Sequence, residues 1–337
     1  MYRPTPVRGA ARGDALIPTE SKTRDLARLP LVHAIVVTHA GASWLPDCLR
    51  SLAAQDARAR LELVVVDNGS TDGTAALLRA DFPSVAVVRL PENQGYARGN
   101  NAALRRALSA GADFAALVND DVEVEPGWLQ ALLDAAAAHP EAGLFCGTLL
   151  FRHEQRVNST GLTIDAFGRA RDRDFGLPRG QISRGDGPVA GVSGGAALLR
   201  CELLRRTGLF DPGYFAYYED VDLSLRAARA GSLAWYAGQA VARHRFGATA
   251  GAGSPRQRFL LGRGHLRTLA LHQPALRAAA LVPLTAVYRA AVKMPLELLR
   301  GRPALALAEV RAAVAGVAAA LAALPARLRK IPPGAEP

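Results

Sequence analysis

Runs of apolar residues recur in the first 120 positions and alternate with segments whose apolar residues have helical spacing. The runs cover residues 31–38, 61–66, 85–90 and 114–118. Because each run is continuously apolar rather than alternating, we expect strands that are buried on both faces. Regular alternation of strands and helices predicts an α/β fold, with a mostly parallel central sheet flanked by helices.

The second half of the chain has weaker periodicity. A helix after Pro126 precedes an apolar strand over 144–151, and a short strand is expected over 235–241. Between them, charges of both signs alternate from Arg169 to Asp174, a pattern typical of a solvated surface. A small-residue turn at Gly194 and Gly195 either lets the backbone approach a ligand closely or forms a bend.

The positive charge of the chain is concentrated at its C-terminal end. The net charge is +11, and residues 243–337 hold 15 Lys/Arg against 3 Asp/Glu. Such charge binds phosphate, on nucleic acid or on anionic lipid. The segments 278–299 and 312–326 are apolar, and exposed aromatics are not interleaved with the basic residues, which excludes nucleic acid. The second segment is about fifteen residues long, too short to span a bilayer, so the pattern favours an interfacial position on a membrane. The alternative is a helical hairpin packed on the body.

Carboxylates follow two of the predicted strands directly. Asp120 and Asp121 come after the apolar run that ends at Val118, and Asp67 follows the second run. Ligands of open α/β sheets bind beyond the carboxyl ends of the strands, and oxygen ligands there suit Mg²⁺ or Mn²⁺ together with substrate phosphates. The pair is equally compatible with an acidic turn. Asp67 suits either a ribose or base contact or plain turn chemistry.

Two common nucleotide motifs are missing from the sequence. No Gly-x-Gly-x-x-Gly follows the first strand, and no Gly-x-x-x-x-Gly-Lys-Ser/Thr occurs. A dinucleotide-binding Rossmann domain and a P-loop NTPase are therefore disfavoured. The three cysteines match no metal spacing and no disulfide framework.

Three segments together resemble the family-two glycosyltransferases, most closely their rhamnosyltransferase-like branch. They are Val-Val-Val-Asp-Asn-Gly-Ser-Thr-Asp-Gly-Thr at 64–74, Asn-Gln-Gly-Tyr-Ala-Arg-Gly-Asn-Asn at 93–101, and Leu-Val-Asn-Asp-Asp at 117–121. The resemblance implies the GT-A fold, a nucleotide-binding sheet joined to an acceptor half. It places the third segment at the family's Asp-x-Asp metal motif, with Asn119 in place of the first Asp.

The resemblance also assigns roles to individual residues. Donor contacts are expected from Thr38, Asp67, Asn68, Asn93, Gly95, Asn100 and Asp120, and metal contacts from Asn119, Asp121 and His244. Glu219 and Asp220 stand where the family keeps its catalytic pair, with Asp220 as general base. They lie beside Asp222 at a helix start, where acidic residues are also favoured by the helix dipole.

These expectations divide the chain into three parts: a disordered basic arm (1–30), a GT-A domain (31–270, with a donor half over 31–125 and an acceptor half over 126–270) and a helical basic tail (271–337). We expect an inverting glycosyltransferase that uses Mg²⁺ or Mn²⁺. Its partners are a nucleotide-diphosphate sugar, a carbohydrate or lipid-linked acceptor and a membrane surface, with no nucleic acid, and we expect it on the inner face of the cell membrane. The alternatives are a sugar nucleotidyltransferase and a non-catalytic sugar-nucleotide binding module.

Overall fold

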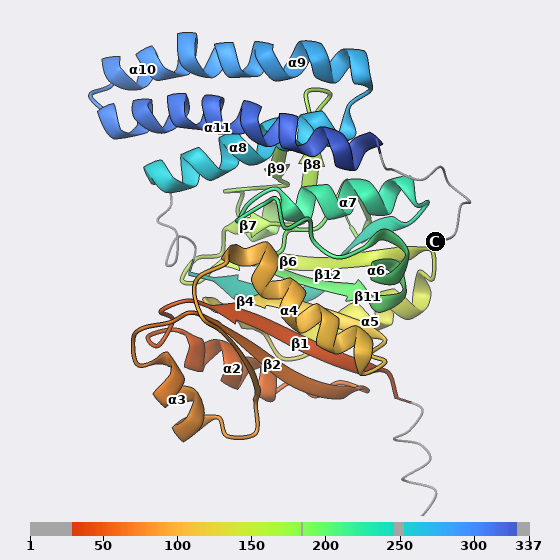
Figure 1. Ribbon diagram of the computed structural model, residues 1–337. Helices are drawn as coiled ribbons and strands as arrows, with labels where there is room; N and C mark the ends of the chain where they lie inside the picture. The colour runs from red at the N-terminus through yellow and green to blue at the C-terminus, as the bar shows by residue number, and fades with distance from the viewer. Residues whose placement is uncertain (1–28, 183–184, 246–252, 329–337) are drawn as a thin grey trace, which may run out of the picture.

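The computed structural model describes residues 29–182, 185–245 and 253–328. The arm expected over 1–30 lies outside the described residues, apart from its last two positions. The chain forms a layered α/β body with a stack of helices on one side (Figure 1).

The first half of the chain forms a parallel sheet in the strand order β4-β1-β2-β3. The strands are β1 (Leu31–Thr38), β2 (Arg60–Asn68), β3 (Ala86–Leu90) and β4 (Phe114–Asn119), and the helices between them are α2 (Leu45–Ala53), α3 (Thr74–Asp81) and α4 (Gly95–Ser109). All four apolar runs are therefore strands, as predicted. Their carboxyl ends lie at one edge of the sheet, because parallel strands point the same way.

The second half makes the sheet mixed rather than parallel. Its strands are β5 (Val122–Val124), β6 (Ala142–Phe151), β7 (Val157–Ser159), β10 (Gly187–Val189), β11 (Ala196–Arg200) and β12 (Leu233–His244), and β8 (Leu162–Ile164) pairs separately with β9 (Ala170–Asp172). Strand β11 lies antiparallel between β4 and β6 and so joins the two halves into one sheet. The helical segments are α5 (Trp128–Ala138), η1 (Arg179–Gln181), α6 (Cys201–Thr207) and α7 (Glu219–Arg229).

Both faces of the sheet are covered, which explains the continuous apolar runs. One core cluster includes Ile35 and Leu104 with residues of α4, α6 and α7, and the other packs Leu49 and Trp128 of α2 and α5 against the opposite face. This arrangement confirms the predicted fold class.

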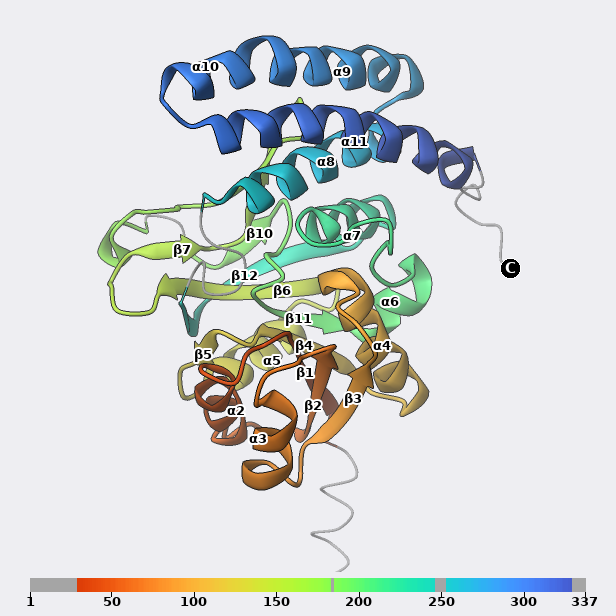
Figure 2. The same cartoon turned by 60° about the vertical axis from the view of Figure 1, so that its left-hand side comes forward.

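The C-terminal helices form a separate layer over the α7 side of the body (Figures 1 and 2). They are α8 (Pro255–His272), α9 (Ala275–Tyr288), the π-helix η2 (Arg289–Lys293), α10 (Met294–Leu299) and α11 (Pro303–Leu328). Helix α11 lies along α8, and α9 with α10 lies outside α11. The expectation that the last apolar segment is too short to span a bilayer was wrong, because the apolar part of α11 covers Pro303–Pro325, which is 23 residues.

The outer helices expose many large apolar side chains. The exposed fraction is 89% for Leu276, 63% for Leu284 and 86% for Leu299. Ala275–Leu299 and Pro303–Pro325 are long and apolar enough to cross a membrane, a criterion that core helices of soluble proteins also meet. Their burial differs: 11% of the apolar window is buried in the first and 44% in the second.

Candidate active site

The turn after β4 meets the end of β12 at the carboxyl edge of the sheet. Asp121 Oδ1 lies 3.1 Å from His244 Nε2, and the strand pairing between β5 and β12 holds the two together. His244 Nδ1 lies 2.8 Å from Asn158 Oδ1. With Nδ1 donating its proton to the amide oxygen, Nε2 presents its lone pair toward Asp121. The structure therefore brings together two of the residues expected at a metal.

The donor set fits a divalent cation that shares its coordination with a substrate. Asn119 Oδ1 is buried and has no hydrogen-bond partner among the described residues, so this oxygen is available to a ligand. Within the described ranges, no three His, Cys, Asp or Glu side chains could by themselves hold a metal ion. Mg²⁺ and Mn²⁺ sites of this incomplete kind take their remaining oxygens from substrate phosphates and water.

Asp120 points the other way and ties β4 to β1. Its Oδ2 accepts a hydrogen bond of 2.7 Å from Thr38 Oγ1, and burial raises the pKa of the carboxyl group to about 6. A Cβ at Gly41 would lie 2.2 Å from Thr38 Oγ1 and 2.7 Å from Asp120 Oδ2. Thr38 and Asp120, both predicted to contact the sugar donor, thus touch each other. The backbone lies so close to them at Gly41 that only glycine fits there.

Asp67 has the turn role that its sequence left open, and its donor contact stays a prediction. It is 1% exposed, and Oδ1 accepts a 2.9 Å hydrogen bond from the Ser70 amide, which is turn chemistry. Oδ2 accepts no hydrogen bond from a described residue, and Arg89 Nε lies 3.6 Å away. One carboxylate oxygen therefore braces the turn, and the other remains available to a ligand.

The four donor residues predicted on the 68–100 stretch lie together but brace the loop. Asn68 Nδ2 donates to Asn93 Oδ1 and to the Gly95 carbonyl, and Asn100 Nδ2 donates to the Tyr96 carbonyl at 3.0 Å. Gly95 has φ of 82°, and a Cβ there would lie 2.3 Å from the carbonyl oxygen of Phe215. Their side chains thus shape the donor loop and dock it against the segment before α7.

Asp220 lies at the start of α7, where the backbone is strained. Tyr217 and Tyr218 have φ of 66° and 73°, and non-glycine residues in this region cost about 1–3 kcal/mol each. Asp220 Oδ2 accepts a hydrogen bond from the Gly194 amide at 3.0 Å, and Oδ1 accepts one from the Val221 amide at 2.8 Å. Strain of this kind is characteristic of functional sites, where the surrounding structure holds it.

Burial raises the pKa values of Glu219 and Asp220, but the two carboxyl groups have different hydrogen-bond partners. Burial, followed by the charge of Asp220, raises the pKa of Glu219 well above its usual range, and Glu219 Oε2 is buried without a hydrogen-bond partner among the described residues. Burial also raises the pKa of Asp220, but its two backbone donors favour the charged form. We infer that Asp220 ionises first and that Glu219 stays neutral beside it.

Asp222 serves the packing of α7 instead. Its Oδ1 lies 2.7 Å from His272 Nε2 and its Oδ2 lies 2.8 Å from Arg226 Nη2. Burial alone would raise the pKa of Asp222, but the hydrogen bond from His272 and the charge of Arg226 outweigh it and lower that pKa. Asp222 is therefore fully paired between α7 and α8.

The Gly194–Gly195 bend connects the turn after β4 with the start of α7. The Asn119 amide donates to the Gly195 carbonyl at 2.9 Å, while Gly194 donates to Asp220 and accepts a hydrogen bond of 2.6 Å from the Tyr96 hydroxyl. This segment therefore joins the loop at Tyr96, the turn after β4 and Asp220. The sequence left open a close approach of this backbone to a ligand or a bend.

Two residues of the acceptor side were missed. Asn158, which orients His244, lies in a stretch with no sequence signal. Asp172 was taken as part of a solvated surface, but it is half-buried, and burial raises its pKa to about 6. The hydrogen bond from Ser159 and the charge of His244 oppose this rise, and the charge of Asp220 adds to it.

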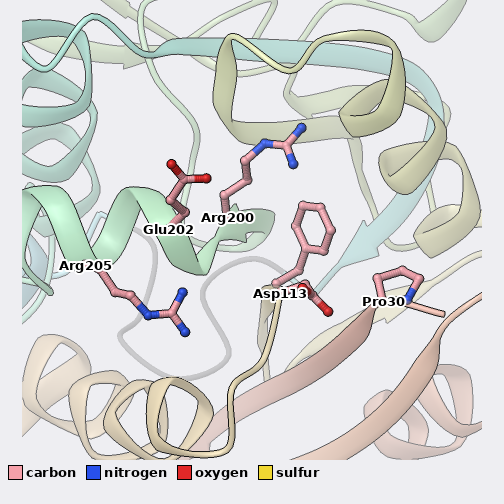
Figure 3. Close-up of a pocket in the computed structure, with 6 residues that line it drawn as sticks. Pro30, Asp113, Arg200, Glu202 and Arg205 are labelled. Carbon is pink, nitrogen blue, oxygen red and sulfur yellow. The ribbon is translucent and has the colours of Figure 1, made fainter. Parts of the chain in front are cut away.

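A cavity of about 430 Å³ lies at the opposite edge of the sheet (Figure 3). Its lining includes Asp113, Arg200 and Glu202. Two of its polar groups have internal partners, because Asp113 accepts a hydrogen bond from the Leu31 amide and Arg200 donates to the carbonyls of Ala136 in α5 and Ala142 in β6. We regard this cavity as structural, since the chemistry lies at the carboxyl ends of the strands.

A family model, "Glycosyl transferase family 2", matches residues 33–208. The chain belongs to this family. The match confirms the family suggested by the sequence motifs and disfavours the nucleotidyltransferase interpretation. The protein is therefore a glycosyltransferase, and the donor-side geometry described above belongs to a nucleotide-sugar enzyme.

Individual proteins agree with this assignment. The chain is 30% identical over 230 residues to an N-acetylglucosaminyl-diphospho-decaprenol L-rhamnosyltransferase of Mycobacterium tuberculosis, covering 62% of this chain and 74% of that protein. The structure of GalNAc-T7 with UDP, GalNAc and Mn²⁺ aligns with a TM-score of 0.56 at 15% identity, over 72% of this chain and 48% of that chain. The mannosyltransferase PcManGT from Pyrobaculum calidifontis aligns with a TM-score of 0.53 at 21% identity, over 87% and 88%. These two structures support the GT-A fold.

Proposed function

We propose that this glycosyltransferase transfers L-rhamnose from a nucleotide-diphosphate sugar to a hydroxyl group of a diphospholipid-linked saccharide, with inversion at the anomeric carbon. The observation that carries the chemistry is Asp220, a carboxylate held by the amides of Gly194 and Val221 at the carboxyl edge of the sheet. The choice of sugar and acceptor rests on the M. tuberculosis relative, which is named for both.

In the proposed reaction, Asp220 accepts the proton of the acceptor hydroxyl as its oxygen attacks the anomeric carbon. The bond from that carbon to the diphosphate breaks on the opposite side, and the nucleoside diphosphate leaves. A single displacement of this kind inverts the configuration and needs no enzyme nucleophile. Because we infer that Glu219 is neutral, it adds no second negative charge beside the incoming hydroxyl.

We further propose that Mg²⁺ or Mn²⁺ is required. Asp121 and His244 would hold it, with Asn119 Oδ1 as a neutral oxygen ligand. The metal, when bound, stabilises the negative charge that grows on the leaving diphosphate. Asn158 fixes the orientation of His244. Asp67 Oδ2 accepts no hydrogen bond from a described residue and lies 3.6 Å from Arg89 Nε, so it suits the ribose or base of the sugar donor.

We propose that the protein works at a membrane surface, on the face formed by α9 and α10. Leu276, Leu284 and Leu299 are highly exposed there, and the C-terminal part of the chain is strongly basic. A spanning position suits α9–α10 less well, because Arg289 and Lys293 contact Glu309 of α11 within the layer. Apolar side chains with basic neighbours are typical of helices that lie in the interface of an anionic bilayer.

The direct test is a transfer assay with a panel of nucleotide sugars. Purified full-length protein is incubated with Mn²⁺ or Mg²⁺, each donor and a diphospholipid-linked N-acetylglucosamine. We expect product only with a rhamnose donor, and its anomeric configuration, read by NMR, should be inverted. Transfer of another sugar in preference to rhamnose would overturn the substrate assignment, and a retained configuration would overturn the displacement mechanism.

A further inference from the structure

A second cavity, of about 340 Å³, lies between the helical layer and the body. Five cationic side chains line it: Arg169, Arg171, Arg258, Arg289 and Lys293. No Asp or Glu is among its described lining residues. Three separate parts of the chain contribute these charges, namely the β8–β9 hairpin, α8 and the π-helix η2, so the cluster is a product of the tertiary fold.

The positive charge of this cavity is only partly neutralised. Glu309 of α11 is fully buried and contacts Arg258 at 3.2 Å, Lys293 at 3.9 Å and Arg289. One carboxylate thus balances three cations. Arg169 and Arg171 form no ion pair with any residue in the described ranges, and they add two further charges at the mouth of the cavity.

The local charge also affects the neighbouring titratable groups. Burial, and then the charges of Arg289 and Arg169, lower the pKa of His265 to about 4. Burial lowers the pKa of Lys293 too; the charge of Glu309 opposes this shift, and the charges of Arg289, Arg258 and Arg169 add to it. Such mutual repulsion between fixed cations is costly unless an anion relieves it.

Arg289 gives independent evidence that the cavity is built for a ligand. The residue is 7% exposed, lines the cavity, and its Nε is buried without a hydrogen-bond partner among the described residues. A Cβ at Gly262 of α8 would lie 2.5 Å from Arg289 Nη1, so a glycine inside a helix makes room for this guanidinium. Arg289 also begins the π-helix, and π-helical segments frequently mark functional sites.

The cavity lies between the membrane-facing helices and the catalytic helix. Tyr218 lines it, two residues before Asp220, and the Tyr218 hydroxyl receives a hydrogen bond from the Ala170 amide of the hairpin. On the other side, η2 continues directly into α10, whose Leu298 and Leu299 are exposed. A ligand with an apolar chain, an anionic centre and a sugar would place the chain along α10, the anionic centre in the cationic cavity and the sugar toward Asp220.

We propose that this cationic cavity binds the diphosphate group of the lipid-linked acceptor. The cavity places the saccharide toward Asp220 and leaves the lipid chain along the exposed face of α9 and α10. This inference rests on the proposed function only for the identity of the saccharide that is linked to the diphosphate. The diphosphate site itself rests on the cation cluster and the unpartnered Arg289 Nε. Guanidinium groups bind phosphate oxygens in paired, directional contacts, which suits a diphosphate better than a single carboxylate.

The test compares a cavity variant with a charge-matched control. Arg169→Gln/Arg171→Gln removes two exposed cations that form no ion pair with a described residue, although Arg169 lies over the Tyr288 ring. Arg302→Gln/Arg311→Gln removes two exposed cations from the same helical layer without touching the cavity. Binding of farnesyl diphosphate, farnesol and inorganic pyrophosphate to each full-length protein is measured by calorimetry in EDTA, so that the donor metal site does not contribute.

We expect wild-type protein to bind farnesyl diphosphate more tightly than farnesol or inorganic pyrophosphate. Affinity should fall roughly tenfold or more in the Arg169/Arg171 variant, since contacts to charged groups are lost, and should stay unchanged in the control. An equal loss in both variants would show general electrostatic attraction and overturn the site. Binding of inorganic pyrophosphate as tight as that of farnesyl diphosphate would overturn the lipid assignment.

Kinetics separates this proposal from the proposed function. In the cavity variant, KM for diphospholipid-linked N-acetylglucosamine should rise roughly tenfold, while KM for a soluble glycoside acceptor without diphosphate should not change. An unchanged KM for the lipid acceptor, with transfer intact, overturns the cavity and leaves the proposed function standing. Selective loss of farnesyl diphosphate binding in a protein that transfers no sugar supports the cavity and rejects the proposed function.

Discussion

Separate replacement of Asp220 and Asp222 by asparagine should show that one carboxylate serves catalysis and the other serves stability, although both lie in one helical turn. Both carboxylates are on the first turn of α7, but they have different partners. Asp220 accepts two backbone amides beside the Gly194 bend, whereas Asp222 is 2% exposed and paired with Arg226 and His272. If Asp220 is the base, the two substitutions should have opposite consequences.

Asp220→Asn keeps the shape of the side chain and removes the proton acceptor. Turnover should fall about 10²–10⁴-fold, the usual contribution of general-base catalysis, with donor affinity unchanged. Two effects on stability oppose each other. Asparagine has one accepting oxygen for the two amides of Gly194 and Val221, so one of these hydrogen bonds is lost. The removal of the buried charge is favourable, because the folded state raises the pKa of Asp220 above its unfolded value. Between those two pKa values the folded protein binds more protons, so the free energy of unfolding decreases as the pH rises. Asparagine removes that decrease.

Asp222→Asn should do the reverse. The pKa of Asp222 is lowered in the folded state, so its stabilisation is fully present above the unfolded pKa and is lost as the pH falls through the folded value. Removing one partner of a buried ion pair costs about 3–5 kcal/mol, and here Arg226 and His272 both lose their carboxylate. The turnover of the fraction that stays folded should change little.

The assay is turnover at saturating donor and acceptor, together with urea unfolding between pH 4 and pH 8, for wild type and both variants. In wild type, turnover should rise with pH as Asp220 ionises, and Asp220→Asn should lose this rise. Near-normal turnover in Asp220→Asn, with a collapse in Asp222→Asn under conditions where both are folded, would refute the reasoning and move the base two residues along the chain.

Three further predictions concern the donor site and the membrane face. Asp121→Ala should abolish stimulation of turnover by Mn²⁺ while Asn119→Asp preserves it, and a metal titration that is unchanged in the alanine variant would contradict the assigned ligand. Leu276→Gln/Leu299→Gln should weaken sedimentation with anionic liposomes at low salt without lowering the melting temperature, since both side chains are exposed; equal sedimentation would remove the membrane face. Gly95→Ala should lower the melting temperature and donor affinity, because its φ of 82° costs a non-glycine residue about 1–2 kcal/mol and the Cβ would clash with a loop carbonyl; a wild-type melting curve would show that the donor loop can yield.

The sequence by itself determined the donor half of the protein. The apolar runs of β1, β2 and β4 are legible because a strand covered on both faces must be continuously apolar. Asp67 and Asp120 could be predicted as site residues because polar residues directly after such strands fall at one edge of a parallel sheet. The family motifs named the same positions. In this half, chain order and spatial order nearly coincide, so local pattern is enough.

Only the tertiary structure decided the acceptor half. The antiparallel insertion of β11 carries Gly194 and Gly195 to both Asn119 and Asp220, and no local pattern encodes that strand order. The alternating charges around Arg169 predicted a solvated surface, because sequence periodicity reflects only the local segment. It does not report contacts with a helix some hundred residues later in the chain. The cationic cavity arises from such distant packing, since like charges that are far apart in sequence are gathered only when α8 and η2 close over the β8–β9 hairpin.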